Sequence, residues 1–147
     1  MNPTLTLGQI RERHPCREGW ETLLRGLGYA DGVFDPGRAV SLGDVATING
    51  AADALWCIRC LDWSDIVVRR TVIGAAILPA VKRAGIRTQD RRVHDCIAAL
   101  ERWVAGEDVD LWSAAATAAV AAWAAETAEE RDQQRADIIA AFPRVAA

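Results

Sequence analysis

The sequence predicts an all-α protein, a compact bundle of about six to seven helices in a single domain over residues 1–147. Hydrophobic residues recur at helical spacing along the whole chain, and no stretch shows the strict alternation that indicates a strand. Short runs of turn-forming residues separate the helical segments. We expect short helices over 6–49, core helices over 51–106 and a long C-terminal helix, rich in alanine and tryptophan, over 110–142.

The N-terminal part carries the signals of two short helices. Thr6 and Gln9 have the spacing of a capping box, which predicts a helix that begins near Leu7. This helix should end before Pro15, because proline suits the first turn of a second helix. Gly28 is the expected end of that second helix, since glycine readily adopts the left-handed conformation that closes a helix.

Turn-forming residues then predict a loop over 29–39. Ser41 and Asp44 have the spacing of a helix start, and Gly50 is the expected end of this short helix. The next segment, from about 51 to 61, has almost no polar face, so we expect it to be central to the core.

Two further helices are predicted in the middle of the chain. Ser64 with Asp65 caps the first, and Pro79 within it should kink or split it near 75–76, because proline removes a backbone hydrogen bond. The second begins at Thr88 and is the most clearly amphipathic helix of the chain. Its apolar stripe consists of Val93, Cys96, Ile97, Leu100, Trp103 and Val104.

The last helix is expected to run unbroken over about 111–141. Its second half, 126–137, is densely charged and is expected to project into solvent or to end the packed region. Apolar residues after this charged half are expected to anchor the tail again: Ile138, Ile139 and Phe142.

Six tryptophans are a high number for 147 residues. Trp112 and Trp123 lie almost three helical turns apart, so both face one side of the alanine-rich helix. The alanines between them allow another helix to approach closely, and that helix belongs either to this chain or to a partner protein. Three others lie on apolar stripes and are expected in the core: Trp20, Trp56 and Trp103.

Charge is distributed unevenly, although the net charge is only −3. Residues 69–92 hold seven basic residues and one acidic residue, and residues 101–137 hold nine acidic residues and three arginines. The two segments can pair with each other, or the basic one can bind a partner. Because the overall balance is acidic, we do not expect nucleic acid as the main partner, and an accessory nucleic-acid-binding role is an alternative. The candidate contact residues are Arg69, Arg70, Arg87, Arg91 and Arg92.

The motif Cys57-Ile58-Arg59-Cys60 is the only one in the chain that suggests metal or redox chemistry. A redox motif of this spacing follows a strand and begins a helix, whereas this one lies inside an apolar helix. We therefore expect buried thiols, no cofactor, no metal and no catalytic residue. A structural zinc site that adds Cys16 and Cys96 to the motif is the alternative, together with a redox role.

The chain shows no signal peptide, and its alanine-rich helix is too weakly hydrophobic for a membrane span. We expect a protein of the bacterial cytosol with free thiols, no membrane partner and a homodimer as one possible assembly.

Several segments together resemble the alanine-rich immunity protein family of bacteria, phages and prophages. They are residues 5–10 with Pro15-Cys16 and Gly19-Trp20, residues 53–59, and residues 90–107 with the alanine-rich helix after them. The resemblance implies a small non-enzymatic protein that binds another protein and blocks its functional surface. The implied partner is a toxin, or a component of a bacterial defence system that an anti-CRISPR-type protein would inhibit.

Overall fold

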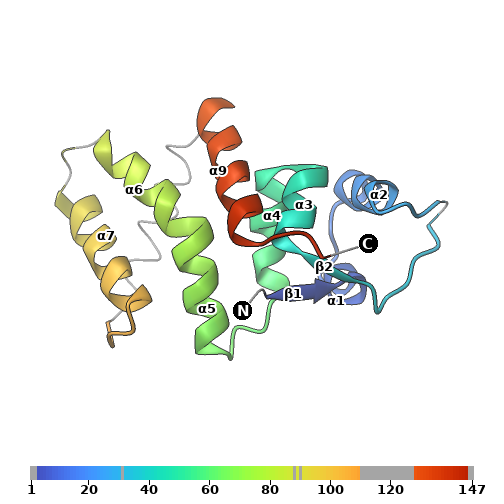
Figure 1. Cartoon of the computed structure of the whole chain (residues 1–147), viewed down its shortest axis with the longest axis horizontal. Coiled ribbons are helices and arrows are strands. Elements are labelled where there is room, and N and C mark those ends of the chain that lie inside the picture. The colour runs from blue at the N-terminus through green and yellow to red at the C-terminus, as the bar shows by residue number, and fades with distance from the viewer. Residues whose placement is uncertain (1–2, 31, 88, 90, 110–127, 146–147) are drawn as a thin grey trace. The chain divides into compact units, whose positions relative to one another are not determined.

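A computed structural model of the chain describes residues 3–30, 32–87, 89, 91–109 and 128–145. The chain divides into two compact units, an N-terminal unit (residues 1–63 with 138–147) and a central unit (residues 64–137). The prediction of an all-α fold is confirmed, since the described residues form helices and connecting turns apart from two short strands (Figure 1).

The N-terminal unit contains both strands and the first helices (Figure 1). In chain order these elements are β1 (Thr4–Thr6), α1 (Leu7–Glu12), α2 (Arg17–Gly26), β2 (Ala39–Ser41), α3 (Leu42–Asn49), α4 (Ala51–Cys57) and the 3₁₀ helix η1 (Ile58–Cys60). The strands correct our expectation that the chain holds no sheet. They pair antiparallel with Leu5 opposite Val40, and three residues each are too few to produce a visible alternation in the sequence.

The last residue of each strand is also the N-cap of the next helix. These caps, Thr6 and Ser41, are the helix starts that the sequence predicts. Both positions form complete capping boxes. The hydroxyl of the cap residue accepts the backbone N–H of the third helical residue, and the side chain of that residue accepts the backbone N–H of the cap residue. Gly50 ends α3 with a φ of 97°, which also agrees with the prediction. The second helix differs, because Cys16 is its N-cap and Pro15 therefore precedes the helix instead of lying in its first turn.

The C-terminal residues complete the core of the N-terminal unit. Ile138 and Phe142 are each 1 % exposed, which confirms that the tail is anchored. The hydroxyl of Ser41 donates to the Phe142 carbonyl (3.3 Å). The Asp44 carboxylate, 2 % exposed, accepts hydrogen bonds from the Arg144 guanidinium (3.0 Å) and from the backbone N–H of Val145 (3.1 Å). These contacts fasten the end of the chain to the start of α3.

The Asp44 contacts make the stability of the N-terminal unit dependent on pH. Burial alone would raise the pKa of Asp44, but the hydrogen bonds from Ser41, Arg144 and Val145 outweigh it and leave this pKa below its ordinary value. The carboxylate therefore stabilises the fold fully above about pH 4, the ordinary aspartate value, and loses this contribution as pH falls through the lower native pKa. We expect the stability difference between wild type and Asp44→Asn to shrink from pH 7 to pH 3 in urea unfolding. The exposed Asp35→Asn control should show a small difference at every pH, and a constant difference for Asp44→Asn would contradict the assignment.

The central unit is built around α5 (Ile66–Val72), the π-helix η2 (Ile73–Ile77), α6 (Leu78–Ile86) and α7 (Arg91–Val104). The interruption predicted from Pro79 is confirmed, since a π-helical turn replaces regular α-helix just before it. Asp65 caps α5 through its side chain, also as predicted. Thr88, the predicted cap of α7, lies outside the described residues.

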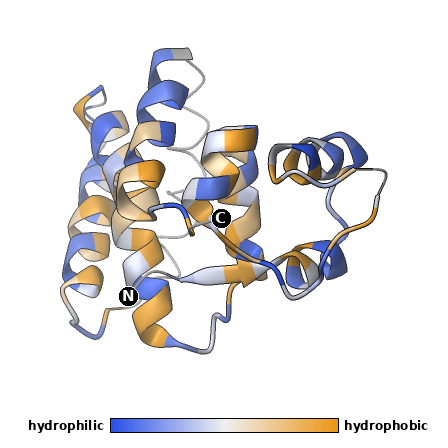
Figure 2. Ribbon diagram, turned by 45° about the vertical axis from the view of Figure 1, so that its right-hand side comes forward, coloured by the Kyte–Doolittle hydropathy of each residue, from blue (hydrophilic) through white to orange (hydrophobic). Residues whose placement is uncertain are grey.

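The apolar stripe predicted for α7 faces the core of the central unit. Cys96, Leu100 and Trp103 are buried, and the first two form a cluster with Val81 of α6. Orange and blue residues alternate along the helices in Figure 2, as expected for elements with one buried and one exposed face. Gly85 of α6 allows close packing here, because a Cβ at this position would collide with Ile97.

Helix α9 (Ala128–Ala141) agrees only in part with the expectation that 126–137 projects into solvent, because most of its described charged residues are exposed whereas Glu130 and Gln134 are buried. Glu130 is only 6 % exposed and accepts three hydrogen bonds from Arg83 of α6, two at Oε1 (2.7 and 2.8 Å) and one at Oε2 (3.0 Å). Arg83 also pairs with Asp137 at 2.8 Å. Glu130 is buried where a basic residue meets it, so the internal pairing of the two charged segments is present at Arg83. The rest of the predicted long helix, with Trp112 and Trp123, lies outside the described residues.

Among the helices described, none combines the length and the apolar run that a membrane crossing requires.

Candidate functional site

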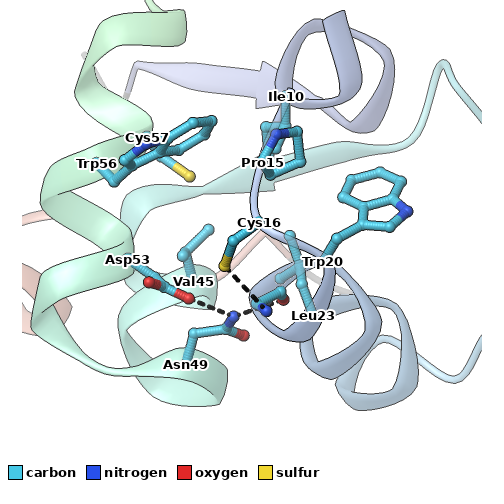
Figure 3. Close-up of a pocket in the computed structure, with 11 residues that line it drawn as sticks. Ile10, Pro15, Cys16, Trp20, Leu23, Val45, Asn49, Asp53, Trp56 and Cys57 are labelled. Carbon is cyan, nitrogen blue, oxygen red and sulfur yellow. Dashed lines mark hydrogen bonds between the residues drawn. The ribbon is translucent and has the colours of Figure 1, made fainter. Parts of the chain in front are cut away.

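The N-terminal unit contains a pocket of about 130 Å³ between α2 on one side and α3 and α4 on the other (Figure 3). Most of its lining is apolar, and it brings together two segments that the sequence analysis singled out, residues 15–20 and 53–57. The residues that line it are Ile10, Pro15, Cys16, Gly19, Trp20, Leu23, Val45, Asn49, Asp53, Trp56 and Cys57.

Trp20 and Trp56 are the aromatic residues of the pocket, and both are half-buried. This corrects the prediction that they lie in the core, whereas Trp103 is buried as predicted. Phe34 holds the Trp20 ring in an edge-to-face contact, with 5.0 Å between the ring centroids and an interplanar angle of 87°. Each indole is therefore partly packed against the protein and partly accessible to a ligand in the pocket.

An arginine lies over each of these two indoles. The Arg11 guanidinium is 5.8 Å from the Trp20 ring centroid, and the Arg59 guanidinium is 4.8 Å from the Trp56 ring centroid. Arg59 also donates from Nε to the Trp56 carbonyl (3.1 Å), which fixes its position. Both distances are within the range of cation–π attraction, so the arginines limit the motion of the indoles.

A polar cluster closes one end of the pocket and links its three helices (Figure 3). The Asn49 amide donates to the Gly19 carbonyl and to the Asp53 carboxylate, each at 2.8 Å. Gly19 is required at this point, because a Cβ there would lie 2.8 Å from Asp53 Oδ2 and 3.1 Å from Cys16 Sγ. The Asn49 Oδ1 atom is buried and has no hydrogen-bond partner among the residues that the structure describes. The cluster fixes the spacing of α2, α3 and α4, and with it the shape of the pocket.

The cysteines of the predicted motif behave as core thiols. Burial raises the pKa of Cys57 to about 12, and it also raises the pKa of Cys60, so both remain protonated at neutral pH. Cys57 is the last residue of α4 and Cys60 the last of the short 3₁₀ helix η1 that follows it directly, so neither lies at the start of an α-helix, where the dipole activates a redox thiol. This supports the interpretation of both as buried thiols.

The other two cysteines have different roles. Cys16 is exposed and caps α2, where its Sγ accepts the Gly19 N–H at 3.4 Å. Cys96 is buried in the central unit. Within the described ranges, no three histidine, cysteine, aspartate or glutamate side chains converge as metal ligands. The zinc alternative therefore has no geometric support in this part of the chain.

The basic candidates of the central unit lie on three helices or at their ends. Arg69 and Arg70 are half-buried in α5, and the Arg70 guanidinium lies 5.5 Å from the Trp103 ring centroid. Arg87 at the end of α6 and Arg91 at the start of α7 are exposed. Arg92 follows in α7, and its side chain is outside what the structure describes, as are Trp112 and Trp123.

The pocket is a site that spacing arguments do not reveal, because its two aromatic residues lie 36 positions apart in the sequence. Comparisons with protein-family models, with curated proteins and with solved structures give no match to this chain.

Proposed function

We propose that this protein is a non-enzymatic inhibitor that binds another protein through the pocket of its N-terminal unit and blocks that protein's functional surface. The observation that carries the proposal is the pair of half-buried tryptophans at the pocket, each held in place by an arginine. Tryptophan and arginine are the residues most enriched among those that dominate binding energy at protein interfaces.

The pocket is built to bind without rearrangement. Asn49 fixes α2, α3 and α4 relative to one another, and the edge-to-face contact with Phe34 fixes Trp20. A site that is already ordered loses little conformational entropy when a ligand enters, so more of the contact energy appears as affinity. Such a rigid pocket suits an inhibitor, which needs a long-lived complex more than it needs a chemical group.

The biological role that follows from the resemblance is protection of a cell from a toxin, or of a phage from a defence system. Both roles require only that the partner's active or binding surface be covered. The residues that carry the resemblance in the N-terminal unit, around Trp20 and Trp56, are those that meet at the pocket. The proposal therefore places the partner of this immunity or anti-defence protein at that pocket.

The first experiment identifies the partner and tests the pocket together. The tagged protein is incubated with a bacterial lysate that contains toxins and CRISPR effectors, and a stoichiometric partner is identified, purified and assayed with and without the protein. We expect Trp56→Ala to weaken the complex about 100-fold in calorimetry, the effect of removing a dominant interface residue.

The matched control is Trp63→Ala. Trp63 is also half-buried in the N-terminal unit, but it does not line the pocket and donates its indole N–H to the Ile58 carbonyl (3.0 Å). This variant should retain wild-type affinity once circular dichroism shows that both variants are folded. Equal affinity of wild type and Trp56→Ala for a partner that is inhibited would place the interface elsewhere, and a partner whose activity is unchanged would refute inhibition.

A further inference from the structure

The arginines beside the pocket restrict what its partner can be. Arg11 and Arg59 are exposed, and no carboxylate of the described residues forms an ion pair with either of them. These two arginines lie over the two indoles of the pocket. Two guanidinium groups without an ion pair among the described residues therefore lie against indoles that line the pocket, whereas the charged side chain of the lining itself is the Asp53 carboxylate.

The size of the pocket indicates what enters it. Its volume, about 130 Å³, is close to that of apolar cavities of about 150 Å³ that hold one benzene molecule. Leu23, Val45 and Ile10 make the lining apolar, and the indoles of Trp20 and Trp56 offer edges and faces to a further ring. One six-membered aromatic ring fits this space.

We infer that the pocket binds an acidic segment of a partner protein that inserts a phenylalanine or tyrosine ring, with the flanking carboxylates on Arg11 and Arg59. This inference rests on the proposed function and names the chemistry of the partner. The Asp53 carboxylate lies at the polar end of the pocket, where it accepts a hydrogen bond from Asn49, so the aromatic ring rather than a carboxylate of the partner has to enter the pocket. The carboxylates of the partner remain outside, where the two guanidiniums form charge-assisted hydrogen bonds with them.

Short synthetic peptides test this chemistry without knowledge of the natural partner. The probe is an acetylated and amidated peptide with phenylalanine between two Asp-Glu pairs, titrated into the ¹⁵N-labelled full-length protein. We expect the indole N–H signals of Trp20 and Trp56 to shift, and a peptide with alanine in place of phenylalanine to bind about tenfold more weakly. A peptide with lysines in place of the acids should bind at least as poorly. Failure of the acidic phenylalanine peptide to bind, or equal binding of the lysine peptide, would overturn the inference.

Charge reversal in the protein is the second arm. The double variant Arg11→Glu/Arg59→Glu should weaken the acidic peptide about tenfold and remove most of the salt dependence between about 50 and 300 mM. The matched control is Arg87→Glu/Arg91→Glu, which makes the same charge change at exposed positions of the central unit. It should bind the peptide as the wild type does. Equal effects of the two double variants would mean that only net charge matters and would refute a specific role for Arg11 and Arg59.

The two proposals can fail separately. If Trp56→Ala abolishes binding of the natural partner while Arg11→Glu/Arg59→Glu leaves it unchanged, the pocket is the interface but the partner segment is not acidic. If the acidic peptide binds as expected but no partner is inhibited, the inference about the pocket is supported and the proposed inhibitory function is refuted.

Discussion

Replacing Phe142 with alanine is expected to lower the free energy of unfolding of the N-terminal unit by about 3 to 5 kcal/mol. The side chain is 1 % exposed, so the substitution removes a large apolar group from a packed core and leaves a cavity behind. The surroundings cannot collapse easily, because the Phe142 backbone is itself fixed, with its N–H on the Ile138 carbonyl (2.9 Å) and its carbonyl on the Ser41 hydroxyl (3.3 Å). A loss of this size is comparable to the whole stability of many small domains.

Urea unfolding followed by tryptophan fluorescence measures the loss, with Val33→Ala as the control. Val33 is 75 % exposed, and its truncation should change the free energy of unfolding by less than about 0.5 kcal/mol. If Phe142→Ala behaved like Val33→Ala, the C-terminal residues would not belong to the core of this unit.

Local signals in the sequence predict much of the fold. The capping boxes at Thr6 and Ser41 are confirmed, because each depends on residues only three positions apart. The interruption before Pro79 follows from the covalent structure of proline itself. The stripe of α7 is confirmed because helical periodicity is strongest when one face is buried and the other is solvated.

Features that depend on distant residues are the ones that the sequence does not reveal. The burial of Glu130 requires Arg83, which is 47 positions away and has no local signal. The pairing of β1 with β2 involves strands of three residues, too short for periodicity to register. The charge balance of the two segments allows internal pairing, but no spacing rule identifies Arg83 and Glu130 as the pair, and no local signal identifies β2 as the partner of β1.

The candidate site likewise combines features that local sequence signals predict with contacts between distant residues that they do not predict. Trp20 and Trp56 lie on apolar stripes, and a stripe does not distinguish a core residue from one at the edge of a pocket. The structure makes the distinction, because both tryptophans are half-buried and line the pocket. The spacing of Arg11 and Arg59 in the sequence does not indicate that they lie over the two indoles.

The end of the chain and the pocket are connected through α3. Asp44 near the start of this helix holds the C-terminal residues, whereas Val45 and Asn49 farther along it line the pocket. Because a helix is stiff over two turns, a change at its start is expected to alter the position of Asn49 and thereby the closed end of the pocket.

Gly43→Ala at the start of α3 is accordingly expected to lower the free energy of unfolding by about 2 to 3 kcal/mol. Helix propensity alone favours the substitution by about 1 kcal/mol, because alanine is the better helix former. A Cβ at Gly43, however, would collide with the backbone carbonyl oxygen of Phe142, and a backbone atom cannot rotate away as a side chain can. The collision therefore outweighs propensity, and the Phe142 hydrogen bond to Ser41 has to break or lengthen.

The control for Gly43→Ala is Gly37→Ala, where the nearest atom to a Cβ is Asp35 Oδ1 at an ordinary 3.4 Å. Gly37→Ala should leave the free energy of unfolding within about 0.5 kcal/mol of wild type. Titration of the acidic phenylalanine peptide into both variants then shows whether the disturbance reaches the pocket, and we expect weaker binding only for Gly43→Ala. Stabilisation by Gly43→Ala would mean that the chain end does not lie against α3, because only the absence of the Phe142 carbonyl would leave helix propensity to decide the result.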